Sequence, residues 1–189
     1  MRTQKNNMSL TEKNLREKDF HNELQSRPKG RFENIFYKSI ANIWDDFYER
    51  LKKDSRNAEV LDYGCGVGPS IIEVSNYKPK KVTGIDISEI SIKKAKDKTK
   101  FLGSMVELKV DNCEKTSFEN DQFDLVYGHG ILHHLEFSKS LDEILRILKP
   151  GGIFYLSTPN FRYCYLSLIH ISEPTRRTPI SYAVFCLKK

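Results

Sequence analysis

A glycine-rich segment, residues 60–70 (VLDYGCGVGPS), holds the residue types that can bind a charged ligand. It contains one acid, Asp62, followed by Gly64, Gly66 and Gly68. Glycine lacks a Cβ, so it permits a positive φ and lets a ligand approach the backbone closely. Free amides at the start of a following helix would suit the carboxylate end of such a ligand. The alternative interpretation is a structural turn between a strand and a helix.

The spacing of these glycines distinguishes between classes of cofactor. A dinucleotide-binding GxGxxG pattern would need its third glycine at position 69 or 71, where the chain has Pro69 and Ile71. Neither register fits the dinucleotide pattern. The segment has instead the form D-x-G-x-G-x-G.

Two further acids stand at the ends of predicted strands. Asp86 closes the run KVTGID, 18 residues beyond Gly68, where a carboxylate can accept hydrogen bonds from both hydroxyls of a ribose. Asp111 follows the run VELKV. Asp86 could instead cap the next helix, and Asp111 could simply belong to a turn. Because the carboxyl ends of parallel strands meet at one edge of a sheet, all three acids are expected at one crevice.

The elements that would position these acids alternate between β-rich and helical runs from Glu59 onward. This alternation predicts an α/β fold, a Rossmann-like doubly wound sheet with five parallel strands. The expected strands are residues 60–63, 81–87, 106–110, 123–127 and 153–157. The expected helices are residues 69–77, 89–100 after the cap Ser88, and 138–148, the last ended by a KPGG turn.

Residues 1–57 are expected to form an N-terminal helical extension. Apolar residues between Ile35 and Leu51 recur at the spacing of a helix that buries one face. A weaker helical segment lies near residues 10–24, beyond a polar stretch that contains Pro28 and Gly30.

The D-x-G-x-G-x-G string resembles motif I of class I S-adenosylmethionine-dependent methyltransferases, and the resemblance covers residues 59–160. The segment after the fourth strand, with its Leu132-His133-His134 string, is similar to the branch that acts on small molecules. The resemblance implies S-adenosylmethionine as cofactor, with Asp62 facing its ammonium group, Asp86 its ribose and Asp111 its adenine amine. The cofactor-binding residues it implies are Asp62, Gly64, Cys65, Gly66, Gly68, Asp86, Ile87, Asp111, Asn112, Cys113 and Gly128.

The implied reaction is methyl transfer to an oxygen, nitrogen or carbon atom of a small-molecule acceptor. His129 and His133 are the catalytic candidates, as a general base or as hydrogen-bond partners of the acceptor. They are four residues apart, but no third ligand is evident nearby, so no metal site is expected. Consecutive His133 and His134 should point in different directions. Residues 34–53 would be a lid over the substrate or a plain packing helix.

Two rival functions remain open at this point. One is a methyltransferase-like module that binds the cofactor, or only partners, without catalysis. The other is a nicotinamide-dependent oxidoreductase on a similar sheet. Binding of S-adenosylhomocysteine or of NAD would distinguish them.

The segment from Leu166 (LSLIHISEPTR) resembles the in-frame translation of a transposase-type sequencing-library adapter. We therefore expect residues 166–189 to be an artefactual tail, the last two strands of the family to be missing, and the edge of the fifth strand to be bare. Without this tail, 27 Lys and Arg remain against 24 Asp and Glu, so the formal charge falls from +6 to +3. That small excess weighs against a nucleic-acid partner.

The composition limits the classes of protein to which the chain can belong. The chain of 189 residues suits one domain with a real core, and no apolar run reaches the roughly 18 residues of a membrane span. The polar start MRTQKNNMSL is unlike a secretory signal. Four cysteines without a CxxC pair indicate reduced thiols and a cytoplasmic location. The pattern leaves the oligomeric state open.

Overall fold

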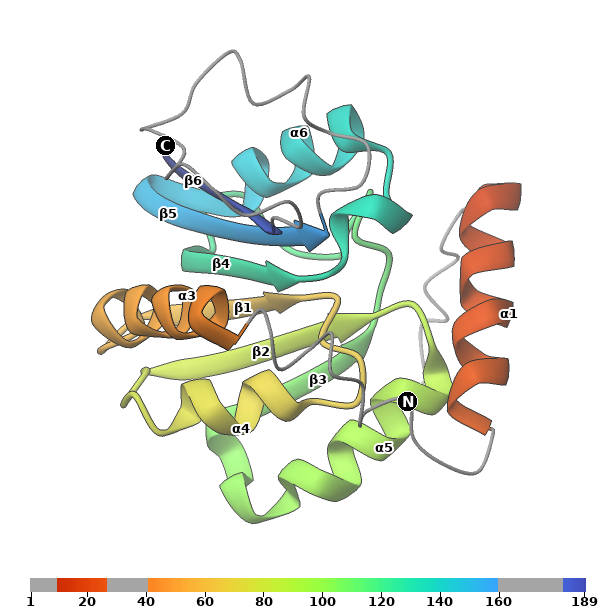
Figure 1. Cartoon of the computed structure of the whole chain (residues 1–189), viewed down its shortest axis with the longest axis horizontal. Coiled ribbons are helices and arrows are strands. Elements are labelled where there is room, and N and C mark those ends of the chain that lie inside the picture. The colour runs from red at the N-terminus through yellow and green to blue at the C-terminus, as the bar shows by residue number, and fades with distance from the viewer. Residues whose placement is uncertain (1–9, 27–40, 160–181) are drawn as a thin grey trace, which may run out of the picture.

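A single six-stranded sheet organises the chain, for which a computed structural model describes residues 10–26, 41–159 and 182–189 (Figure 1). The strand order is β3-β2-β1-β4-β5-β6, with all neighbours parallel except β5 and β6. The strands are β1 (Glu59–Tyr63), β2 (Lys81–Asp86), β3 (Val106–Val110), β4 (Phe123–His129), β5 (Leu148–Pro159) and β6 (Tyr182–Lys188). The expected doubly wound sheet of five parallel strands is confirmed, and the strand order reverses between β1 and β4, a position where such sheets bind ligands.

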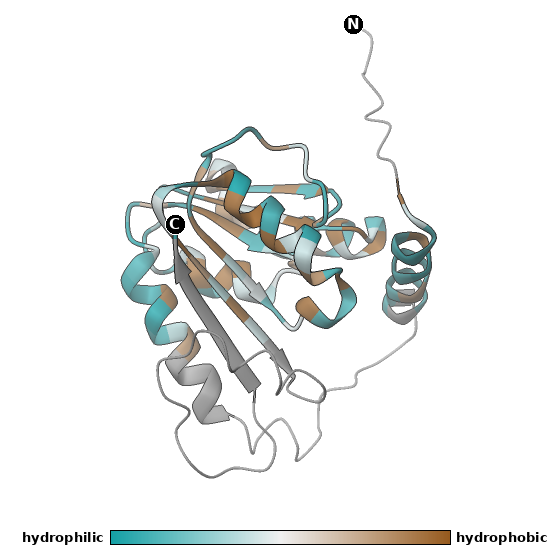
Figure 2. Cartoon of the chain, turned by 90° about the horizontal axis from the view of Figure 1, so that it is seen from above, coloured by the Kyte–Doolittle hydropathy of each residue, from teal (hydrophilic) through white to brown (hydrophobic). Residues whose placement is uncertain are grey.

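Helices cover both faces of the sheet (Figures 1 and 2). They are α1 (Glu12–Ser26), α3 (Ala41–Asp54), α4 (Pro69–Ser75), α5 (Glu89–Thr99) and α6 (Phe137–Ile147), with the 3₁₀ turns η1 (Lys100–Met105) and η2 (Leu132–His134). One apolar cluster joins α3, α4 and α5 to the sheet, and a second joins α6 to its other face. Among the described helices, none is long and apolar enough to cross a membrane.

Predominantly apolar runs account for the central strands. Val60, Leu61 and Tyr63 of β1 are fully buried, as expected for a parallel strand covered on both faces. The predicted cap of α5 is confirmed, because the backbone N–H of Ser91 donates to Ser88 Oγ at 3.1 Å.

The KPGG segment differs from the prediction. Helix α6 does end before it, at Ile147, but the segment lies inside β5 instead of forming a separate turn. The pairing of β5 with β4 shifts register there, from Phe123 opposite Leu148 to Leu125 opposite Ile153. Gly151, with φ of 81°, permits this irregularity within the strand.

The edge of β5 is not bare, so that expectation was wrong. Residues Tyr182–Lys188 form β6, which pairs antiparallel with β5 from Ile153 to Pro159. The segment contains Tyr182, Val184 and Phe185, residue types that favour strands, and an open strand edge offers unpaired main-chain groups to such a segment. Main-chain pairing requires no particular sequence, so the foreign origin of residues 166–189 stays a prediction. Residues 166–181 lie outside the described part of the chain.

The two N-terminal helices have different positions. Phe47 and Leu51 of α3 are buried in the core against the sheet, so this part of the predicted lid is a packing helix. Residues 34–40 of the lid prediction fall outside the described ranges. Helix α1 instead stands across the carboxyl ends of the central strands (Figure 1). It is largely hydrophilic along its length (Figure 2).

Candidate functional site

The loop after β1 has a backbone conformation that favours glycine at three positions. Gly64, Gly66 and Gly68 have φ of 84°, 54° and 80°, which side chains rarely permit. A Cβ on Gly64 would lie 2.6 Å from Ile131, so that glycine is required by packing. A Cβ on Gly66 would meet no atom within 4 Å. The loop therefore leaves open space beside the backbone of Gly66, where a ligand can approach closely.

Asp86, at the end of β2, is fixed by backbone donors. Its Oδ2 accepts a hydrogen bond from the N–H of Gly66 at 2.9 Å, and its Oδ1 accepts one from the N–H of Ser88 at 2.8 Å. Burial raises the pKa of this carboxyl, although both hydrogen bonds oppose the shift. A carboxylate oxygen can accept more than one hydrogen bond, so both oxygens remain able to accept from ligand hydroxyls. Asp86 thus ties the glycine loop of β1 to the start of α5.

Asp62 is completely enclosed at the end of β1. Its Oδ2 accepts hydrogen bonds from Ser70 Oγ at 2.6 Å and from the hydroxyl of Tyr127 at 2.9 Å. Burial raises its pKa from 3.8 to about 7, against the opposing effect of these two hydrogen bonds, and the charge of Asp86 adds to the rise. A cation bound beside Asp62 would favour its charged form.

Asp111 holds together the turn after β3. Its Oδ1 accepts a hydrogen bond from the N–H of Asn112, and its Oδ2 accepts from the N–H and hydroxyl of Ser117 at 2.9 and 2.7 Å. These contacts are those of a turn residue, the alternative that the sequence left open. The adenine contact predicted for Asp111 stays a prediction.

The two cysteines of the predicted site are buried and contribute to packing. Cys65 and Cys113 are both buried and free, and burial raises the pKa of each thiol well above its usual value. The hydroxyl of Tyr63 donates to the carbonyl of Cys113. Neither thiol is therefore an activated nucleophile.

Two other predicted cofactor-binding residues, Ile87 and Gly128, lie directly after β2 and within β4. Ile87 directly follows Asp86 and is half-buried. Gly128 is buried in β4, and a Cβ there would lie 3.0 Å from the carbonyl oxygen of Tyr63 and 2.8 Å from Leu156. The close approach of neighbouring strands is thus sufficient reason for glycine at position 128.

His129 lies at the end of β4, facing α3. Its Nδ1 is 2.7 Å from Ser157 Oγ, and its ring lies 5.6 Å from that of Phe47, measured between centroids. Burial lowers the pKa of His129 to about 3, so the imidazole is neutral at pH 7. It can form a hydrogen bond that orients a polar group, but it is a weak base.

The neighbouring histidines do not point apart, contrary to the prediction. The rings of His133 and His134 lie 3.9 Å apart between centroids, because both belong to the tight turn η2. His134 is the hydrogen-bonded one, with its Nδ1 2.8 Å from Glu17 Oε2. His133 is exposed, and desolvation followed by the charge of His134 lowers its pKa.

Helix α1 contributes to this region in a way that the sequence did not indicate. Its polar side chains contact the segments that follow three strands. Asn22 accepts a hydrogen bond from Ser88 Oγ, after β2, at 2.5 Å, and Asn14 accepts one from Asn112 Nδ2, after β3, at 3.3 Å. Glu17 contacts His134 of η2, after β4. These contacts join residues far apart in the sequence, so no periodic pattern within residues 12–26 predicts them. Together they hold α1 across the carboxyl ends of these strands.

Comparison with known proteins identifies what this arrangement is similar to. Residues 61–156 match the family described as "Methyltransferase domain". A ubiquinone/menaquinone biosynthesis C-methyltransferase UbiE of Geobacter sulfurreducens is 31% identical over 163 residues, covering 81% of this chain and 62% of that protein. The 24-methylenesterol C-methyltransferase 3 of Arabidopsis thaliana is 29% identical over 132 residues, covering 66% of this chain and 37% of that protein.

Solved structures show the same fold. The crystal structure of PH0226 protein from Pyrococcus horikoshii superposes with a TM-score of 0.59 and 31% sequence identity, covering 76% of this chain and 68% of that one. YcgJ of Bacillus subtilis superposes with a TM-score of 0.56 and 26% identity over 61% of this chain and 51% of that one. The chain spans only 37% to 62% of the length of the curated relatives named above.

Proposed function

This chain belongs to the methyltransferase domain family, whose members have the class I Rossmann-like fold and use S-adenosylmethionine, and we propose that it transfers a methyl group from that cofactor to a carbon atom of a small-molecule acceptor. Bound S-adenosylmethionine supplies an electrophilic methyl group on a positively charged sulfur. The observation that carries the proposal is the open space beside Gly66, whose amide is held by Asp86.

The acids at the strand ends would hold the cofactor at separate points. Asp86 would accept hydrogen bonds from the ribose hydroxyls, since two backbone donors already fix its orientation. Asp62 would interact with the ammonium group, which would favour the ionised carboxylate despite its burial. Asp111 would act through the turn that it stabilises, placing Asn112 and Cys113 along the adenine edge.

The properties of His129 favour a carbon nucleophile that needs no strong base. Methyl transfer from a sulfonium disperses charge, so alignment and exclusion of water are the main requirements. A neutral His129 held by Ser157 can hydrogen-bond an acceptor hydroxyl and orient it. An electron-rich ring carbon beside such a hydroxyl would form a bond to the methyl carbon as the bond from that carbon to sulfur breaks. The proton of the ring carbon would then pass to water, so no strong base is needed before the transfer. The names of the quinone and sterol relatives given above, both C-methyltransferases, agree with this choice.

A methyl-transfer assay tests the proposal. The full chain would be incubated with radiolabelled S-adenosylmethionine and, separately, a hydroxylated quinol, a sterol and a primary amine. We expect label in the quinol or sterol, attached to carbon by mass spectrometry, and a loss of rate in His129→Ala without loss of S-adenosylhomocysteine binding. Binding without transfer to any acceptor would support the non-catalytic module, and binding of NAD would support the oxidoreductase.

A further inference from the structure

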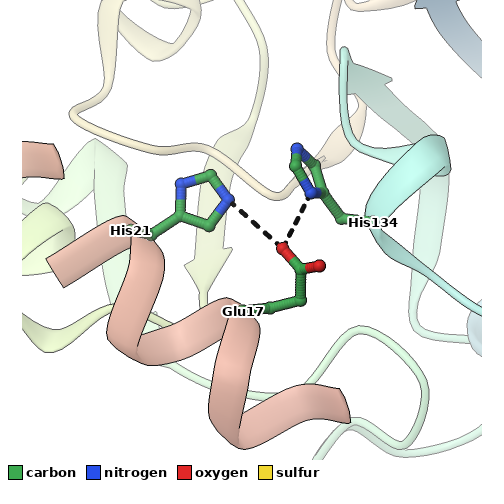
Figure 3. A group of neighbouring side chains, drawn as sticks. All are labelled: Glu17, His21 and His134. Carbon is green, nitrogen blue, oxygen red and sulfur yellow. Dashed lines mark hydrogen bonds and ion pairs between the residues drawn. The ribbon is translucent and has the colours of Figure 1, made fainter. Parts of the chain in front are cut away.

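Two imidazoles and one carboxylate come together between α1 and the turn η2 (Figure 3). Glu17 and His21 stand one helical turn apart on α1, so their side chains share a face. His134 approaches from η2. Its Nδ1 is 2.8 Å from Glu17 Oε2, and His21 Nε2 is 3.9 Å from the same oxygen. Within the described ranges, this is the group of three whose donor atoms all lie within 4.8 Å of one another.

We propose that Glu17, His21 and His134 form a binding site for a divalent transition-metal ion, with Zn²⁺ as the representative ion. Two imidazole nitrogens and a carboxylate oxygen are a ligand set that zinc accepts. Zinc–ligand distances near 2.1 Å in a tetrahedron separate the ligand atoms by about 3.4 Å. The observed separations of 2.8 and 3.9 Å lie on either side of that value. Small side-chain movements would therefore complete the geometry.

The exposure of the three side chains suits a site that is open to solvent. They are 28%, 30% and 22% exposed for His21, Glu17 and His134. An ion can therefore enter directly, and its fourth position would remain available to water or to a ligand group, as in zinc sites with three protein ligands. Because the ligands come from two elements far apart in the sequence, the ion would cross-link those elements.

The cross-link would matter because α1 is otherwise attached mainly by polar contacts. Lys18 forms an ion pair with Glu89 at 2.6 Å, on α5. The large apolar side chains Leu15 and Phe20 of α1 are 46% and 47% exposed, so they contribute little to its attachment. A metal ion at Glu17, His21 and His134 would thus fix α1 over the strand ends and slow the exchange of a ligand bound beneath it.

Calorimetric titration of the tag-free full chain with ZnCl₂ tests this site. We expect one high-affinity ion per chain, weakened by more than about 100-fold in Glu17→Gln, His21→Ala and His134→Ala, because loss of even an outer partner of a metal ligand costs up to that factor. Asp19→Asn on the same helix and His133→Ala beside His134 are the matched controls, and both should bind zinc as the unaltered chain does. Substitution with Co²⁺ should give visible absorption bands typical of mixed nitrogen and oxygen coordination.

Hydrogen exchange provides a readout of the cross-link itself. Zinc should slow exchange of the α1 amides in the unaltered chain and in both controls, but not in His134→Ala. The proposal would be overturned if the folded chain, identified by its circular dichroism, bound no zinc, or if the three ligand variants bound it as tightly as the controls. A histidine–carboxylate hydrogen-bond network without metal affinity would give the first of these results.

Discussion

The buried carboxyl of Asp62 should make the chain less stable as pH rises, and Asp62→Asn should remove that effect. The introduced amide would have nearly the same shape as the carboxyl, and its carbonyl oxygen could accept the hydrogen bonds that Ser70 and Tyr127 donate to Asp62. It can never be charged. The substitution therefore isolates the cost of ionising one enclosed carboxyl group.

The magnitude follows from linkage. In the unfolded chain the carboxyl ionises near 3.8, whereas in the folded chain its pKa is raised to about 7. The folded state therefore holds a proton that the unfolded state has released, and stability from this group is lost as pH rises through the folded pKa. The slope is about 1.4 kcal/mol for each pH unit while the folded group stays protonated, and it falls as that group ionises, so the loss between pH 5 and pH 7 is about 2.3 kcal/mol.

Urea unfolding of both chains at pH 5 and pH 8 measures this difference. We expect the stability of Asp62→Asn relative to the unaltered chain to rise by roughly 2 to 3 kcal/mol between pH 5 and pH 8. Asp97→Asn on the exposed side of α5 is the control and should show no such pH dependence. If Asp62→Asn were no more stable at pH 8 than at pH 5 relative to the unaltered chain, Asp62 would not be held protonated by burial.

Two further substitutions test the loop and the helix beside it. Gly66→Val would place a side chain in the open space and should abolish S-adenosylhomocysteine binding, measured by calorimetry. Gly151→Val is the control, because Gly151 also has a positive φ and open surroundings; both variants should lose about 1 to 2 kcal/mol of stability, but Gly151→Val should keep binding. Equal binding by the two variants would contradict a ligand beside Gly66. Ser88→Ala removes the cap of α5 and should lower the free energy of unfolding by about 1 kcal/mol in thermal or urea melts, and an unchanged melt would mean that the cap contributes nothing.

The central strands were predictable because most of their residues are apolar. The edge strand Val106–Val110, in which apolar and charged residues alternate, was also expected with its observed bounds, and Ser88 was expected as the cap of α5. The acids at the strand ends were also predictable, since parallel strands bring their carboxyl ends to one edge. These features depend on local sequence and on the topology that it dictates.

The parts that could not be predicted depend on contacts between distant segments. Glu17 meets His134 across 117 positions, and a polar helix such as α1 has no apolar period to indicate what it packs against. The irregular pairing at KPGG depends on register with β4, which glycine permits but does not specify. The turn η2, which brings the rings of His133 and His134 within 3.9 Å of each other between centroids, likewise depends on tertiary contacts.

Calorimetric titration of the full chain and of Asp86→Ala, each with S-adenosylhomocysteine and with NAD, tests the cofactor assignment most directly. We expect the unaltered chain to bind S-adenosylhomocysteine and not NAD. We expect Asp86→Ala to lose at least about 2 kcal/mol of that binding, a value within the range for a hydrogen bond to a charged group. Heat from NAD, or full binding of S-adenosylhomocysteine by Asp86→Ala, would contradict a crevice in which this carboxylate holds the ribose of a methyl donor.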